Sequence, residues 1–286
     1  MNRRDAIRLL SLAALACAAE AKKTTTMQPL PRIGLGTWQT FNVTPSQYGP
    51  LEEVLREFVN LGGKLIDSSP MYGRSEEAVG DIAAKLGVHD RLFLATKVWT
   101  SGRQAGIAQM EESMRKLRTK RIDLMQVHNL VDAATHLDTL RAWKKEGRIR
   151  YLGITHYTSG AYGQVEAMLR REPVDFLQIN YSVGEREAER RLLPLAKEKG
   201  ISVIANRPFA EGALLRQLAA KPLPDFAKEI DCTSWAQLLL KFVISHPAIT
   251  AAIPATSKVK HLRDNMAAAH GRMPDPALRQ RIAAAV

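Results

Sequence analysis

A repeated alternation of short apolar strands with amphipathic helices is the feature that most limits how this chain can fold. One helical pattern places Leu51, Val54, Leu55, Phe58 and Val59 at the three- and four-residue spacing of a helix that packs on a sheet. Strands that alternate with helices favour a parallel sheet. The segments that we interpret as strands are residues 33–38, 65–67, 92–96, 123–127, 150–154, 175–179, 201–205 and 249–253.

The number of strand–helix units decides between two α/β architectures. Eight units in a chain of 286 residues predict a (β/α)8 TIM barrel, and we expect residues 33–286 to form it as a single domain. An open doubly wound sheet is the alternative, but Gly34 and Gly36 lack the third glycine of a dinucleotide-binding turn and come before, not after, a good strand. Residues 22–32 are polar and rich in threonine and proline, which predicts a linker.

Composition and charge exclude several classes of function. The net charge of +12 would suit a nucleic-acid partner, but the charges are spread along the expected helix faces and no basic run is interleaved with aromatic residues. The two cysteines, Cys17 and Cys232, indicate neither a disulfide framework nor a metal site. No apolar run is long enough to span a bilayer. We therefore expect no nucleic acid, no metal and no stable membrane span.

Residues 1–21 have the features of an export signal. Arg3-Arg4 precedes an apolar run over residues 9–19, and residues 19–21 fit a small-x-small cleavage site. The arginine pair resembles the twin-arginine export motif of bacteria, which implies the twin-arginine export machinery as a partner and a periplasmic or otherwise exported location. An ordinary N-terminal amphipathic helix on a cytoplasmic protein is the alternative. Lipidation of Cys17 also stays open.

Single polar residues end three successive strands and point to proton transfer. Asp67, Lys97 and His128 follow apolar runs, and Tyr72 lies in the loop after Asp67. In a barrel, the carboxyl ends of the strands meet at one mouth, where reacting groups gather. A phenol has a pKa near 10, and we expect the Lys97 ammonium, held by Asp67, to lower it. With His128 to hydrogen-bond a carbonyl oxygen or relay a proton, the set would protonate an oxygen as negative charge develops on it.

These segments resemble the catalytic tetrad of the aldo-keto reductases. The resemblance implies a barrel that binds NADPH without a Rossmann domain and reduces an aldehyde or ketone to an alcohol. It implies Tyr72 as the general acid, assisted by Lys97, Asp67 and His128. The motifs that carry it are Asp67-Ser68-Ser69-Pro70-Met71-Tyr72-Gly73, Thr96-Lys97 and Gln126-Val127-His128-Asn129.

The same resemblance implies the residues that bind the cofactor. His156 and Ala255 depart from the family pattern, as does His261, which stands where an arginine is common. Lys258 and Arg263 favour NADPH, with NADH as the alternative. Ser257 and Lys258 precede an expected helix, whose N-terminus attracts anions. The implied cofactor-binding residues are Gly36, Thr37, Trp38, Thr155, His156, Gln178, Arg207, Pro208, Phe209, Thr256, Ser257, Lys258, Arg263 and Asn265.

Two other functions fit parts of the pattern. A barrel aldolase or lyase would use Lys97 as a Schiff-base nucleophile, without any dependence on nicotinamide. A regulatory subunit would bind NADPH without turnover. The presence of all four residues, Asp67, Tyr72, Lys97 and His128, argues against lost catalysis.

Overall fold

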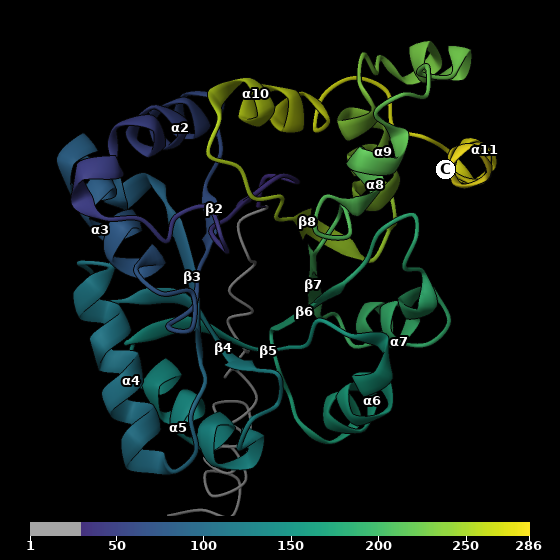
Figure 1. Cartoon of the computed structure of the whole chain (residues 1–286). Coiled ribbons are helices and arrows are strands. Elements are labelled where there is room, and N and C mark those ends of the chain that lie inside the picture. The colour runs from purple at the N-terminus through teal and green to yellow at the C-terminus, as the bar shows by residue number, and fades with distance from the viewer. Residues whose placement is uncertain (1–29) are drawn as a thin grey trace, which may run out of the picture.

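The computed structural model describes residues 30–286, and its centre is a single curled sheet of eight parallel strands (Figure 1). Each strand pairs with the next one along the chain, in sequence order. The prediction of an α/β fold with eight parallel strands is therefore confirmed. The strands are β1 (Leu35–Gly36), β2 (Leu65–Asp67), β3 (Phe93–Val98), β4 (Ile122–His128), β5 (Ile149–Thr155), β6 (Phe176–Asn180), β7 (Ser202–Asn206) and β8 (Ile249–Ala252).

Backbone hydrogen bonds also join the two ends of this sheet. The Gly34 N–H donates to the Ala252 carbonyl at 2.8 Å, and the Ala252 N–H donates to the Arg32 carbonyl at 2.9 Å. Gly36 allows this approach, because a Cβ there would lie 2.7 Å from the Ile253 carbonyl oxygen. Arg32 belongs to the segment predicted as a linker, so the last residue of that segment already pairs with the sheet.

Helices surround the outer face of the sheet (Figure 1). The five apolar residues expected on the first helix are all buried in α2. The connection from β7 to β8 holds several helices instead of one. The α-helices are α2 (Gly49–Asn60), α3 (Ser75–Leu86), α4 (Arg103–Lys116), α5 (Ala133–Lys145), α6 (Tyr162–Arg171), α7 (Leu192–Glu198), α8 (Ala213–Leu218), α9 (Trp235–Ile244), α10 (Val259–Ala267) and α11 (Pro276–Ala285). Short 3-10 helices are η1 (Pro45–Gln47), η2 (His89–Arg91), η3 (Ser159–Ala161), η4 (Glu187–Glu189) and η5 (Asp225–Ile230).

Alternate residues of each strand face the interior of the curled sheet. Because side chains alternate along a strand, Leu124, Gln126 and His128 share one face of β4. The interior residues nearer the amino ends of the strands are apolar, whereas those at the carboxyl ends are mostly polar, with Ile253 after β8 as an exception. The polar groups are thereby collected at one end of the sheet. The apolar interior cluster is Leu65, Phe93, Ala95, Leu124, Phe176, Ile204, Ala251 and Ile253.

Several strands run one or two residues further than the sequence pattern indicated. Lys97 and His128 were expected just after their strands, but they lie within β3 and β4. Parallel pairing uses backbone groups only, so it continues past the point where the side chains turn polar.

The predicted export signal, residues 1–21, lies outside the described residues, as does Cys17. Within residues 30–286, no helix has both the length and the apolar character that crossing a membrane requires. In the same range, no group of three or more histidine, cysteine or acidic residues could hold a metal ion.

Candidate active site

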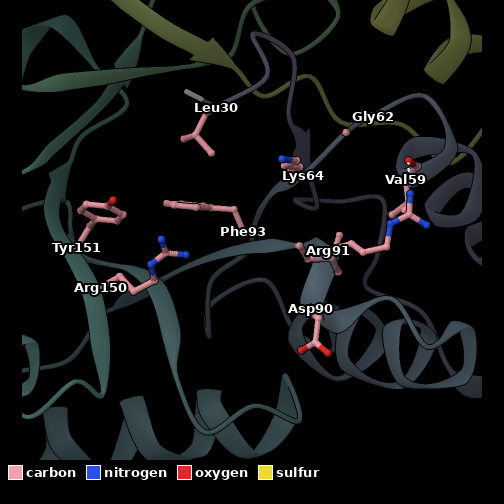
Figure 2. Close-up of a pocket in the computed structure, with 11 residues that line it drawn as sticks. Leu30, Val59, Gly62, Lys64, Asp90, Arg91, Phe93, Arg150 and Tyr151 are labelled. Carbon is pink, nitrogen blue, oxygen red and sulfur yellow. Dashed lines mark hydrogen bonds between the residues drawn. The ribbon is translucent and has the colours of Figure 1, made fainter. Parts of the chain in front are cut away.

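Two cavities lie at opposite ends of the curled sheet. One, of about 360 Å³, opens at the amino ends of the strands, between Phe93, Tyr151 and Arg150 (Figure 2). The other, of about 810 Å³, opens at the carboxyl ends and is lined by Asp67, Tyr72 and His128, among others. Since only the second cavity contains the polar strand ends, it is the candidate active site.

A buried ion pair lies beneath this cavity. Lys97 Nζ is 2.6 Å from Asp67 Oδ2 and donates a second hydrogen bond to the Ser68 carbonyl at 2.7 Å. Neither side chain is appreciably exposed. Burial opposes the ammonium form, but the charge of Asp67 and the interaction with Tyr72 outweigh it, so the pKa of Lys97 lies above its ordinary value. Lys97 is therefore an ammonium ion at neutral pH.

Tyr72 lies beside this ion pair, in the loop after β2. Its N–H donates to the Ser69 carbonyl at 3.0 Å, and Lys97 Nζ is 4.9 Å from the centroid of its ring. Burial of the phenol raises the pKa of Tyr72 and outweighs the lowering by Lys97, while the Asp67 carboxylate adds to the rise. Lys97 lowers the pKa of Tyr72, as predicted, but the prediction is wrong for the net direction, because burial of the phenol outweighs the effect of Lys97. Tyr72 holds its proton at neutral pH.

His128 is a neutral imidazole at the end of β4. Burial, followed by the positive charge of Lys97 and the nearby His156, lowers its pKa to about 2. Its Nδ1 lies 3.2 Å from the Ser69 hydroxyl oxygen, and its ring stands edge-on to the Tyr72 ring with the centroids 6.0 Å apart. His128 can therefore hydrogen-bond a ligand oxygen without carrying a charge.

Two glutamines complete the surroundings of Asp67. Gln178 donates to Asp67 Oδ1 at 2.7 Å, and Gln126 donates to the same oxygen at 3.2 Å. Strands β2 and β6 are not neighbours in the sheet, so the contact between Asp67 and Gln178 crosses its interior. Sequence reasoning missed Gln126. The signal was available, because Gln126 precedes His128 by two residues and so shares its face of the strand.

Most residues implied for cofactor binding line the cavity, but four do not. His156 is not part of the cavity lining, and its Nδ1 accepts the Tyr157 N–H at 3.0 Å. Arg263 forms an ion pair with Glu57 of α2 at 2.7 Å. Ser257 and Lys258 are exposed and also lie outside the cavity lining. The residues that do line it are Gly36, Thr37, Trp38, Thr155, Gln178, Arg207, Pro208, Phe209, Thr256 and Asn265.

Two asparagines at the cavity have side-chain oxygens without a partner. Among the described residues, the Oδ1 atoms of Asn129 and Asn206 are buried and accept no hydrogen bond. The Nδ2 of Asn206 donates to the His156 carbonyl at 3.2 Å. Buried polar atoms are nearly always hydrogen-bonded in native proteins, so these two oxygens are free to accept hydrogen bonds from a ligand in the cavity.

Large apolar side chains surround the mouth of the cavity. Trp38, Met71, Trp99 and Tyr157 line it and are each at least 39% exposed. The Trp99 ring lies 6.4 Å from the His128 ring, measured between centroids. The reacting groups therefore lie at the base of a cleft whose rim is apolar.

Comparisons with known proteins agree on one family. Residues 32–280 match the model of the aldo/keto reductase family. The sequence is 31% identical to methylglyoxal reductase YeaE of Escherichia coli over 246 residues, which is 83% of this chain and 85% of that protein. The structure resembles that of an aldo/keto reductase from Klebsiella pneumoniae in complex with NADP and acetate, with a TM-score of 0.76, 27% identity and coverage of 88% of this chain and 90% of that one. A structure from the same organism in complex with NADPH gives a TM-score of 0.74 at the same identity and coverage.

Proposed function

Because the chain belongs to the aldo/keto reductase family, we propose that it reduces an aldehyde or ketone to an alcohol with NADPH. One observation carries the proposal: Asp67, Tyr72, Lys97 and His128 come together at the carboxyl end of the sheet, three of them lining one cavity and Lys97 lying directly beneath it. Reduction of a carbonyl requires a proton donor, a positive charge that stabilises the anion left after proton transfer, and a neutral group that hydrogen-bonds the carbonyl oxygen.

Residues along the cavity would hold the cofactor in an extended pose. The segments at Gly36–Trp38, Arg207–Phe209 and Thr256 lie on its wall, and the free oxygens of Asn129 and Asn206 are suited to an amide N–H. When bound, NADPH supplies the hydride. NADH stays the alternative cofactor, because the charge of Arg263 is shared with Glu57.

Tyr72 is the proton donor in this scheme. Its raised pKa keeps the proton on the phenol until the carbonyl oxygen becomes basic. Lys97 then stabilises the phenolate that remains, and Asp67 keeps Lys97 charged and in position. His128 donates a hydrogen bond to the same carbonyl oxygen and orients it toward Tyr72. A site that aims charge and donors at the developing negative charge lowers the barrier to reaction.

The properties of Lys97 argue against a Schiff-base aldolase. Such an enzyme needs an unprotonated amine with access to substrate. Lys97 is wholly buried, its pKa is raised, and it donates hydrogen bonds to Asp67 and to the Ser68 carbonyl. Nothing favours a nucleophilic amine at this position.

Consumption of NADPH with a panel of carbonyl compounds tests the proposal. We expect turnover of at least one aldehyde or ketone, and methylglyoxal belongs in the panel because a relative is named for it. Tight NADPH binding without turnover of any carbonyl would instead support a regulatory subunit. Trapping of a carbonyl substrate on Lys97 by borohydride, without nicotinamide, would support an aldolase.

We propose that residues 33–286 form one closed barrel domain. The hydrogen bonds that Ala252 makes with Gly34 and with Arg32 support closure of the sheet. A single domain is expected to unfold in one cooperative urea transition. Two separate transitions would indicate that these residues form two domains.

We also propose that residues 1–21 direct export through the twin-arginine machinery. The arginine pair, the apolar run and the small-x-small site support this. Expressed in a bacterium, the full chain is expected to be cleaved and recovered from the periplasm, whereas a variant with Arg3→Lys and Arg4→Lys stays uncleaved in the cytoplasm. If the variant were cleaved and exported to the same extent as the wild-type chain, residues 1–21 would not be a twin-arginine signal.

A further inference from the structure

Ser69 makes a contact with His128 that the proposed chemistry leaves unused. The Ser69 side chain is fully buried in the loop between β2 and α3. Its Oγ lies 3.2 Å from His128 Nδ1 and accepts the Met71 N–H at 3.4 Å. These are the two hydrogen bonds of Ser69 Oγ in the described structure.

The direction of the hydrogen bond between Ser69 and His128 follows from these partners. If His128 Nδ1 donated its proton to Ser69, the serine oxygen would accept twice and its own proton would have no acceptor in a buried place, which is unfavourable. If Ser69 donates to Nδ1, both the serine hydroxyl and Nδ1 are satisfied. The neutral imidazole then carries its proton on Nε2, the nitrogen that remains for the cavity.

We propose that Ser69 is a positioning residue that fixes both the tautomer and the orientation of His128. The role rests on the proposed function, because an Nε2–H donor facing the cavity is what a carbonyl oxygen needs. Ser69 does not touch the substrate in this scheme. It acts through His128, much as a carboxylate or carbonyl behind a histidine selects its tautomer in other sites.

A second histidine gives an internal reference for this arrangement. His136 Nε2 lies 2.7 Å from the Thr100 carbonyl, which can only accept, so His136 also carries its proton on Nε2. Its Nδ1, however, is buried without a hydrogen bond. The two rings therefore differ at Nδ1, which accepts a hydroxyl proton in His128 and nothing in His136.

Nitrogen-15 NMR of the full chain labelled at histidine tests the proposal directly. We expect both rings to show a protonated Nε2, with the Nδ1 resonance of His128 displaced from that of His136 by its hydrogen bond. His128→Asn identifies the His128 signals. In Ser69→Ala, loss of the hydroxyl is expected to let the Nδ1–H tautomer of His128 become populated, so that its Nδ1 resonance moves away from that of His136 toward that of a protonated nitrogen. We expect kcat for carbonyl reduction to fall about threefold to tenfold with KM little changed.

Ser69→Cys separates the hydroxyl from the volume of the side chain, because a thiol is a weak donor of similar shape. We expect it to resemble Ser69→Ala in both measurements. Protonation of His128 at Nδ1 in the wild-type protein, or wild-type behaviour of either variant, would overturn the proposal. The NMR result does not depend on turnover. An inactive wild-type protein would therefore refute the proposed reaction, while the NMR spectra would still show which atom donates in the hydrogen bond between Ser69 and His128.

Discussion

Replacement of Tyr72 by phenylalanine is expected to lower kcat by about 100- to 10,000-fold, the range that a general acid contributes. The substitution removes the hydroxyl that transfers the proton and retains the ring beside Lys97. Binding of NADPH, followed by fluorescence titration, is expected to change little, because the phenol serves the carbonyl oxygen and not the cofactor. Initial rates with a substrate found in the carbonyl panel provide the measurement.

Tyr151→Phe is the matched control for this variant. Tyr151 loses the same hydroxyl but lines the cavity at the opposite end of the sheet (Figure 2). We expect its kcat to match that of the wild-type protein. If Tyr72→Phe retained wild-type activity, or if both variants lost activity equally, Tyr72 would not be the proton donor.

Lys97→Met is expected to destabilise the protein by about 3–5 kcal/mol and to abolish turnover. The variant removes the ammonium group that lies 2.6 Å from Asp67 Oδ2. Among the described residues, Gln126 and Gln178 then remain as the hydrogen-bond donors to the buried carboxylate. Urea unfolding measures the change in the free energy of unfolding. The activity is lost because no charge remains to stabilise the Tyr72 phenolate.

A double-mutant cycle isolates the cost of the unpaired charge. Asp67→Asn keeps an oxygen for Gln126 and Gln178 but removes the negative charge, so adding it to Lys97→Met is expected to recover part of the lost stability. Lys241→Met is the control, since Lys241 is a buried lysine that, within residues 30–286, donates to the Ile230 and Arg272 carbonyls and to no carboxylate. Its effect is expected to add to that of Asp67→Asn, because the two sites share no partner. Additivity of Asp67→Asn and Lys97→Met would contradict a coupled ion pair.

Local sequence patterns were sufficient to predict the α/β architecture and to select the candidate reacting residues. The spacing of Leu51, Val54 and Leu55 is enough to predict α2, because helix formation depends on neighbours three and four residues apart. Asp67, Lys97 and His128 could be identified because each is polar after an apolar run, and parallel strands bring such residues to one end of the sheet.

Only the tertiary structure decided how those residues behave. Gln178 contacts Asp67 across 111 positions of sequence, and this contact had no local pattern that could reveal it. The pKa of Tyr72 moved in the direction opposite to the prediction, because burial of the phenol outweighs the effect of Lys97. Arg263 paired with Glu57, which lies on a helix far from it in the sequence. Hydrophobic periodicity depends on residues that are close in the chain, so the sequence alone reveals it. Desolvation and the choice of hydrogen-bond and ion-pair partners are set only when distant segments pack together.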